Sequence, residues 1–298
     1  MPHRLAVGAA LAAGALIAVQ SKVNGELTDI LGYGIVAALV SFTCGTTVWL
    51  LGLAVTGRWR NARRLASGTR WWWWLGGLGG AFLVASLAVA VPETGVALAA
   101  VAFVAGATTG GLLVDRAGIG PGGAHPVNLQ RTAGSLLALL GLTLAAAGAT
   151  GRSRPALLAA VAVAGAFASV QQAANGHLRQ RSGDPFVAAS VNFVVGALAL
   201  GALTGLLAAA GAVPDLDWPT NPVLYLGGLG GAAYITLSAA TVAQLGVLRV
   251  TLATMAGQVL GALALDTALP TAGRPGLATV VAAALTLVAV VVAGRGEV

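Results

Sequence analysis

Long apolar runs fill this chain, and short polar or Pro/Gly-rich breaks separate them. A helix needs roughly 20 mostly apolar residues to cross a hydrocarbon core about 30 Å thick. Runs such as "GLATVVAAALTLVAVVVAG" meet that length without the alternation of a transmembrane barrel strand. The pattern therefore predicts an all-α integral membrane protein with ten transmembrane helices, at about 5–24, 34–56, 72–91, 96–114, 132–150, 156–176, 186–210, 223–243, 250–267 and 276–294.

The composition agrees with this pattern. Of 298 residues, 57% are hydrophobic and only 8% are charged, whereas a soluble domain carries about 25% charged residues. The apolar N-terminal run resembles a signal peptide, but similar runs recur throughout, so we interpret it as the first span. The single Cys44 excludes an internal disulfide framework.

The basic residues predict an orientation. On the ten-span scheme, one side holds twelve of the 16 Lys and Arg residues, and the other holds only Lys22, Arg152, Arg154 and Arg274. Because cytoplasmic loops are enriched in Lys and Arg, we expect both termini in the cytoplasm. The net charge of +7 then reflects contact with anionic lipid rather than nucleic acid.

The chain contains an internal repeat with an offset of 151 residues. "VQSKVNGEL" recurs as "VQQAANGHL", "LGGLGGA" recurs unchanged, and Phe42, Gly95 and Asp115 recur as residues of the same type without a gap. We expect two units, 1–151 and 152–298, each with five spans. Because five is odd, the second unit must enter the membrane upside down, which gives two inverted five-helix repeats, as in many secondary transporters.

Each repeat contains an aromatic segment followed by glycines, "WWWWLGGLGGA" and "YLGGLGGA". We interpret the tryptophans as an interfacial anchor, with substrate stacking by Trp74 as the alternative. Glycines four residues apart lie on one helix face, so each of these helices should cross a partner closely; the pairs are Gly76 with Gly80 and Gly227 with Gly231.

Uncharged polar residues inside the spans are the candidate binding residues, because polar groups within lipid face the bundle interior or a cavity. Gln20 and Asn24 share a face of the first helix, and Gln171 and Asn175 are their counterparts in the sixth. The inverted repeat would place the two pairs at mirrored depths, as two gates or two walls of one cavity. Helix capping or hydrogen bonding between helices is the alternative for all four.

Other polar candidates lie deeper or at span ends. We expect Gln258 and Tyr234 near the midplane, with Asn192 as a further candidate. Asp115 and Asp266 end their spans, where we interpret them first as anchors and second as proton or gate residues. The histidines are assigned to a terminus and to loops, no metal or cofactor motif is present, and no residue pattern suggests an enzyme.

These features resemble the drug/metabolite transporter superfamily, in particular its bacterial branch of small membrane proteins with five-span halves, here in the fused ten-span form. The "Q…NG.L" start of each half, the "LGGLGGA" segment and "LLVD" after the fourth span carry the resemblance over the whole chain. It implies a transporter or exporter of small molecules that works by alternating access. The four-span multidrug relatives have a glutamate in the first helix, whereas "GAALAAGALIAVQ" has no acid.

The sequence therefore predicts a secondary transporter, most simply an exporter of a small neutral or amphipathic metabolite, in the bacterial inner membrane. A lipid scramblase or flippase and a non-transporting membrane assembly protein are the alternatives. The expected partners are the substrate and membrane lipids, with a homodimer left open and no nucleic acid.

Overall fold

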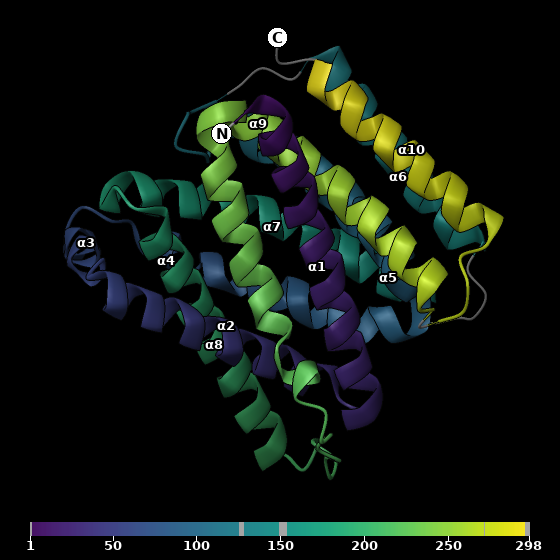
Figure 1. Cartoon of the computed structure of the whole chain (residues 1–298), viewed down its shortest axis with the longest axis horizontal. Helices are drawn as coiled ribbons and strands as arrows, with labels where there is room; N and C mark the ends of the chain where they lie inside the picture. The colour runs from purple at the N-terminus through teal and green to yellow at the C-terminus, as the bar shows by residue number, and fades with distance from the viewer. Residues whose placement is uncertain (1, 125–127, 149–153, 271, 296–298) are drawn as a thin grey trace.

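The structure is a computed structural model that describes residues 2–124, 128–148, 154–270 and 272–295. Within these residues every regular element is a helix (Figure 1). The long helices are α1 (His3–Leu31), α2 (Gly34–Thr56), α5 (Gly76–Arg116), α6 (Leu129–Gly148), α7 (Arg154–Ser182), α8 (Pro185–Ala209), α9 (Gly227–Ala268) and α10 (Leu277–Gly294). The short ones are α3 (Trp59–Ala62), η1 (Arg63–Ala66), α4 (Trp71–Trp74) and η2 (Pro222–Tyr225). Eight helices of the described part are long and apolar enough to cross a membrane.

Helix α5 contains the third and fourth expected spans. It has 41 residues, and at Gly95 the backbone leaves the helical region with φ 78° and ψ 165°. Pro92 lies one turn earlier and cannot donate a backbone hydrogen bond to the preceding turn. The expected division between residues 91 and 96 therefore exists as a break at Gly95.

Helix α9 contains the eighth and ninth expected spans, but as one helix of 42 residues. The expected separation between 243 and 250 is a bend, and Figure 1 shows two arms that meet at the top of the view. The position equivalent to Pro92 is Ala243. Alanine at this position keeps the backbone N–H that proline lacks.

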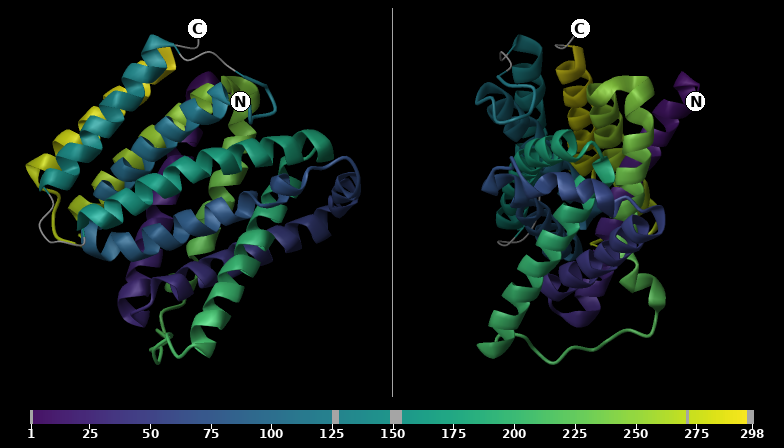
Figure 2. Two further views of the ribbon diagram at one scale, coloured as in Figure 1. Left: turned by 180° about the vertical axis from the view of Figure 1, so that it is seen from behind. Right: turned by 90° about the vertical axis from the view of Figure 1, so that its left-hand side faces the viewer.

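The long helices pack in pairs, and each pair contains one helix from each repeat. Helix α1 packs along α9, and α7, the counterpart of α1, packs along α5, the counterpart of α9. Helices α2 and α8 cross each other, and α6 and α10 lie side by side at one edge of the molecule (Figure 2). Helix α1 begins and α10 ends on the same side of the molecule (Figure 1). The two repeats are thus intertwined and do not form two separate domains.

Candidate functional site

The buried phenyl rings of Phe42 in α2 and Phe193 in α8 contact each other, with centroids 5.3 Å apart. These residues occupy the same position in the two repeats. Glycine makes room for both rings: a Cβ atom on Gly45 would overlap Phe193, and one on Gly196 would overlap Phe42. Equivalent residues thus contact each other, and their surroundings match in the two repeats.

Glycines also allow the close helix crossings. A Cβ atom on Gly106 of α5 would overlap the carbonyl oxygen of Ala162 in α7. At the equivalent place, a Cβ atom on Gly257 of α9 would overlap the carbonyl oxygen of Leu11 in α1. Helices in lipid gain little from moving apolar side chains away from lipid tails, so close backbone contact is a main source of their association. The repeat therefore extends to individual contacts between the halves.

The amides of α1 face the glycine surface of α9. A Cβ atom on Gly231 would lie 2.9 Å from Gln20 Oε1, and one on Gly227 would overlap Asn24 Oδ1. The side-chain nitrogens of both residues donate to Ser41 Oγ in α2, over 3.4 Å from Gln20 and 3.2 Å from Asn24. The expected close partner of the Gly227–Gly231 face is thus the polar face of α1.

The second repeat makes the same arrangement between α7 and α5. A Cβ atom on Gly80 would lie 2.9 Å from Gln171 Nε2, and one on Gly76 would lie 3.4 Å from the oxygens of both Asn175 and Asn192. The amides therefore form two clusters, one between α1 and α9 and one between α7 and α5. This geometry corresponds to hydrogen bonding and packing between helices, the alternative left open for these residues.

Several of these amide oxygens accept no hydrogen bond. Gln20 Oε1, Asn24 Oδ1, Asn175 Oδ1 and Asn192 Oδ1 are buried without a donor. A buried acceptor left unpaired costs about 1–3 kcal/mol. The Cα–H groups of the facing glycines offset only part of this cost, because such contacts are weak hydrogen bonds. Both helix crossings therefore contain amide oxygens whose hydrogen-bonding capacity is only partly used.

The two clusters differ in exposure although their contacts correspond. At the α1 end, Gln20 is 7%, Ser21 is 4% and Asn24 is 2% exposed. At the α7 end, Gln171 and Asn175 are half-buried, and Gln172, the counterpart of Ser21, is exposed. The polar side chains are therefore buried at the end of α1, called the closed end below, and partly exposed at the end of α7, called the open end.

Polar side chains between the two ends gather around Tyr234. Its hydroxyl group lies close to the side chains of Gln172, Thr254 and Ser238, which come from α7 and α9. Gln258, one turn beyond Thr254, is 5% exposed, and its backbone lies where α1 crosses at Gly14. This part of the interface carries hydroxyl and amide groups without a formal charge, so it suits a neutral polar group. Ser238 was not among the polar candidates predicted from the sequence, although its polarity within an apolar run was a usable signal.

The tryptophan segment lies beside the open end. Trp74 donates from Nε1 to Thr69 Oγ1 over 3.2 Å and packs, half-buried, against the apolar cluster that contains Leu65 and Leu178. Trp73 stacks on the ring of His177 with centroids 4.6 Å apart. His177 therefore lies inside α7, which corrects its assignment to a loop. The helix continues there because "NGHLRQRS" contains no proline and packs against α4.

The ionisable residues that the structure describes do not gather as a metal centre would require. Across the described residues, no three His, Cys, Asp or Glu side chains gather closely enough to hold a metal ion. Asp115, near the end of α5, pairs with Arg131 of α6, whereas Asp266, near the end of α9, accepts from the backbone of Val96 in α5.

Comparison with known proteins identifies relatives at the level of family and fold. Residues 5–144 and 156–292 each match the family described as "Putative inner membrane exporter, YdcZ", so the match divides the chain at its internal repeat. Four chains of solved structures are also similar. One, titled "Crystal structure of protein", is 23% identical over 99% of each chain, with a TM-score of 0.59, so it shares the fold. No curated protein matches this chain in sequence.

Proposed function

We propose a function from one established premise: the chain belongs to the YdcZ family of inner membrane exporters, within the drug/metabolite transporters. It is accordingly a multi-pass inner membrane protein with two matching halves. The proposal adds three parts to this premise. The protein crosses the membrane ten times as two inverted repeats, it works by alternating access, and it exports a small neutral or amphipathic metabolite.

The unequal exposure of equivalent residues carries the proposal. Contacts at the two ends of the interface correspond, but Gln20 and Asn24 are buried whereas Gln171 and Asn175 are half-buried. Because the two ends make equivalent contacts, the buried end can become exposed and the exposed end buried without a new kind of contact. Access would then move from one side of the membrane to the other, as in transporters built from inverted repeats.

The topology follows from the helix ends and the basic residues. Both α5 and α9 are long enough to cross twice, since 41 residues of helix span about 60 Å, twice the hydrocarbon thickness. With two crossings each, the described helices make ten spans. Helices α1 and α10 then have their outer ends on the Arg-rich side, which we assign to the cytoplasm. The open end at Gln172 faces the cytoplasm, so the conformation described here is inward-facing.

The substrate contacts are assigned to the polar group around Tyr234. Tyr234, Gln172, Thr254 and Gln258 can each donate and accept hydrogen bonds without the desolvation cost of a buried charge. The amides that pack on the glycine faces, Gln20, Asn24, Gln171, Asn175 and Asn192, flank this group and line the two gates. Trp74 anchors the helix at the open end.

Transport across sealed membranes tests this proposal. Inverted membrane vesicles and proteoliposomes would be given a panel of neutral, amphipathic and charged metabolites, with Gln258→Leu as the loss variant and exposed Gln180→Leu as its control. We expect saturable movement of at least one neutral or amphipathic compound, strongly reduced by Gln258→Leu and unchanged by Gln180→Leu. Equal rates for wild type and Gln258→Leu with that compound would contradict the assigned site. Movement of fluorescent phospholipids alone would replace export with lipid scrambling.

A further inference from the structure

The carboxylate of Asp266, near the end of α9, caps the break in α5. Its Oδ1 accepts from the backbone N–H of Val96 over 3.1 Å, and its Oδ2 accepts from Ala97 over 2.7 Å. These N–H groups directly follow Gly95, where the helix is interrupted, so no preceding helical turn can supply their acceptors. Asp266 is only 3% exposed. One side chain of the second repeat therefore completes the helix start in the first repeat.

Lys22 of α1 strengthens the same junction. Its ammonium group donates to the carbonyl oxygen of Leu269 over 2.8 Å and pairs with Glu26 over 2.9 Å. It is 8% exposed, and its charge acts on the Asp266 carboxylate. Helices α1, α5 and α9 thus meet at the closed end through one carboxylate and one ammonium group.

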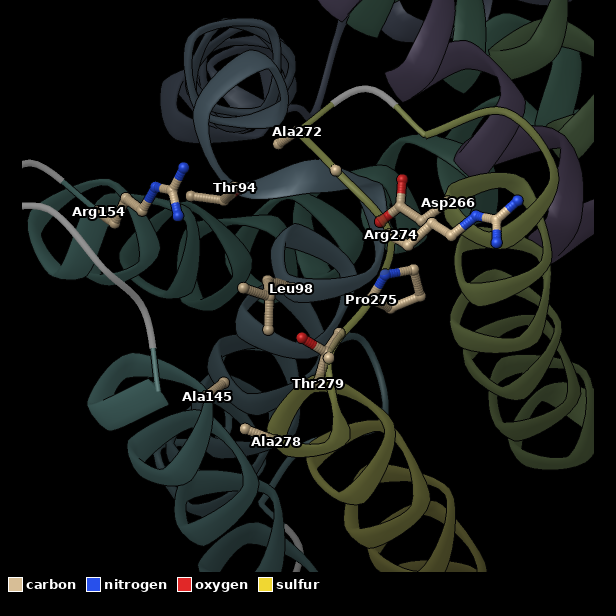
Figure 3. A pocket seen from close by; sticks show the side chains of 12 residues that line it. Thr94, Leu98, Ala145, Arg154, Asp266, Ala272, Arg274, Pro275, Ala278 and Thr279 are labelled. Carbon is tan, nitrogen blue, oxygen red and sulfur yellow. The ribbon is translucent and has the colours of Figure 1, made fainter.

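A cavity of about 170 Å³ lies beside this junction (Figure 3). Asp266 and Thr94 form part of its wall, and Arg274 contributes from the connection between α9 and α10. The Asp266 side chain therefore has open space beside it, with two basic residues, Arg154 and Arg274, in the same wall.

The equivalent carboxylate at the open end has a different partner. Asp115 ends the second arm of α5, 151 residues before Asp266, and it pairs with Arg131 of α6. Its side chain is 35% exposed. The backbone positions that correspond to Val96 and Ala97 are Val247 and Leu248, at the bend of α9. The aspartate is therefore buried at the closed end and partly exposed at the open end, as the amides are.

We propose that Asp266 and Asp115 are alternating latches for the two ends of the molecule. In this conformation Asp266 closes the α1 end by capping α5, and Arg131 holds Asp115 away from α9. In the exchanged conformation α9 breaks at Gly246, the counterpart of Gly95, and Asp115 caps the N–H groups of Val247 and Leu248 that this break frees. Asp266 then turns into the cavity toward Arg274. The inference rests on the proposed alternating access and names the groups that set its equilibrium.

Two cysteine reporters can follow the latches without a known substrate. Ser21→Cys and Gln172→Cys, each in a Cys44→Ser background, occupy equivalent positions in the repeats. Ser21 is 4% exposed and Gln172 is exposed. Membrane vesicles of either orientation would be treated with a membrane-impermeant maleimide. Without latch substitutions, we expect slow labelling at position 21 and fast labelling at position 172, from opposite sides.

The latch variants should change the labelling rates of the two reporter cysteines in opposite directions. Asp266→Asn removes the charge and one of the two accepting oxygens, so labelling at position 21 should rise roughly tenfold while labelling at position 172 falls. Arg131→Gln frees Asp115 and should change both rates in the same directions. Adding Asp115→Asn to Asp266→Asn should return labelling at position 21 toward the starting rate. Exposed Asp217→Asn is the matched control and should change neither rate.

The outcomes separate the latch from a structural role and from the export function. Unchanged labelling at position 21 in both Asp266→Asn and Arg131→Gln would overturn the latch. So would a parallel rise at both reporters, which indicates general loosening, or a double variant that does not reverse the change. If Asp266→Asn does not fold, Arg131→Gln decides alone. If the protein exports a compound but the latch variants leave labelling unchanged, only the latch is rejected. If the latch variants change labelling as expected but no compound is transported, only the exporter function is rejected.

Discussion

Phe42 and Phe193 lie ring against ring, 5.3 Å between centroids, although 151 residues separate them in the chain. Equivalent residues of the two matching halves therefore contact each other directly. Each ring also fills the space that a glycine of the other repeat leaves open. This pair therefore marks the centre of the interface across which both clusters of amides and both aspartates are arranged.

Substitution of the two equivalent glycines at the helix crossings, Gly106 and Gly257, should lower stability by similar amounts. Gly106→Ala and Gly257→Ala would each place a methyl group on a backbone carbonyl oxygen of the partner helix. We expect each to lower stability by about 1–3 kcal/mol, the usual range for overpacking. Gly52→Ala is the control, because nothing lies within 4 Å of its added Cβ, and it should be neutral or slightly stabilising. Thermal unfolding in detergent measures all three, and unequal losses at positions 106 and 257 would argue against equivalent crossings.

Asp184 should stabilise the connection between α7 and α8. It is 4% exposed, it accepts from the Phe186 backbone N–H over 2.9 Å at the start of α8, and it accepts from Asn61 over 2.9 Å and Arg58 over 3.2 Å. Asp184→Ala removes the cap and both links, so we expect a loss of about 2–3 kcal/mol. The melting temperature of the purified protein checks this, with exposed Asp217→Ala as the reference. If the two variants melt together, Asp184 has no such role.

Removal of one hydroxyl group at Tyr234 should impair transport and leave the fold intact. Tyr234→Phe keeps the ring and deletes the group that lies near Gln172 and Thr254. A neutral hydrogen bond contributes about 0.5–1.5 kcal/mol, so we expect roughly a two- to tenfold lower rate. Initial efflux rates from vesicles, normalised to protein amount, provide the measurement. Tyr225→Phe is the control, because its hydroxyl group donates to Pro219 in a surface connection. A full rate for Tyr234→Phe would remove Tyr234 from the site.

The sequence predicts most of the helices because lipid imposes one length and one polarity on every span. Helix α2 begins and ends at Gly34 and Thr56, as expected. The division at Gly95 was visible because Pro92 and a glycine stand close together. The bend of α9 lacks the proline, and helical propensity alone does not indicate whether the hydrogen-bonded helix continues through it.

The site was less predictable for two physical reasons. Spacing shows that Gly227 and Gly231 share a face, but it does not say which helix covers that face, so the contact with Gln20 required the structure. The repeat also encodes both ends in nearly the same residues. A near-symmetric sequence cannot indicate which end is closed, and therefore Asp115 and Asp266 could not be given different partners in advance.

Distances between equivalent pairs of spin labels test alternating access most directly. Glu93 with Thr267 at the closed end corresponds to Gln244 with Arg116 at the open end, and all four residues are exposed. Pulsed electron paramagnetic resonance on each pair, in a Cys44→Ser background in lipid, would give two distance distributions. The account predicts a shorter distance for Glu93–Thr267 than for Gln244–Arg116 in the conformation described here, with a second population in which the order is reversed. One fixed distance for each pair, or distances that lengthen and shorten together, under all conditions including Asp266→Asn, would contradict it.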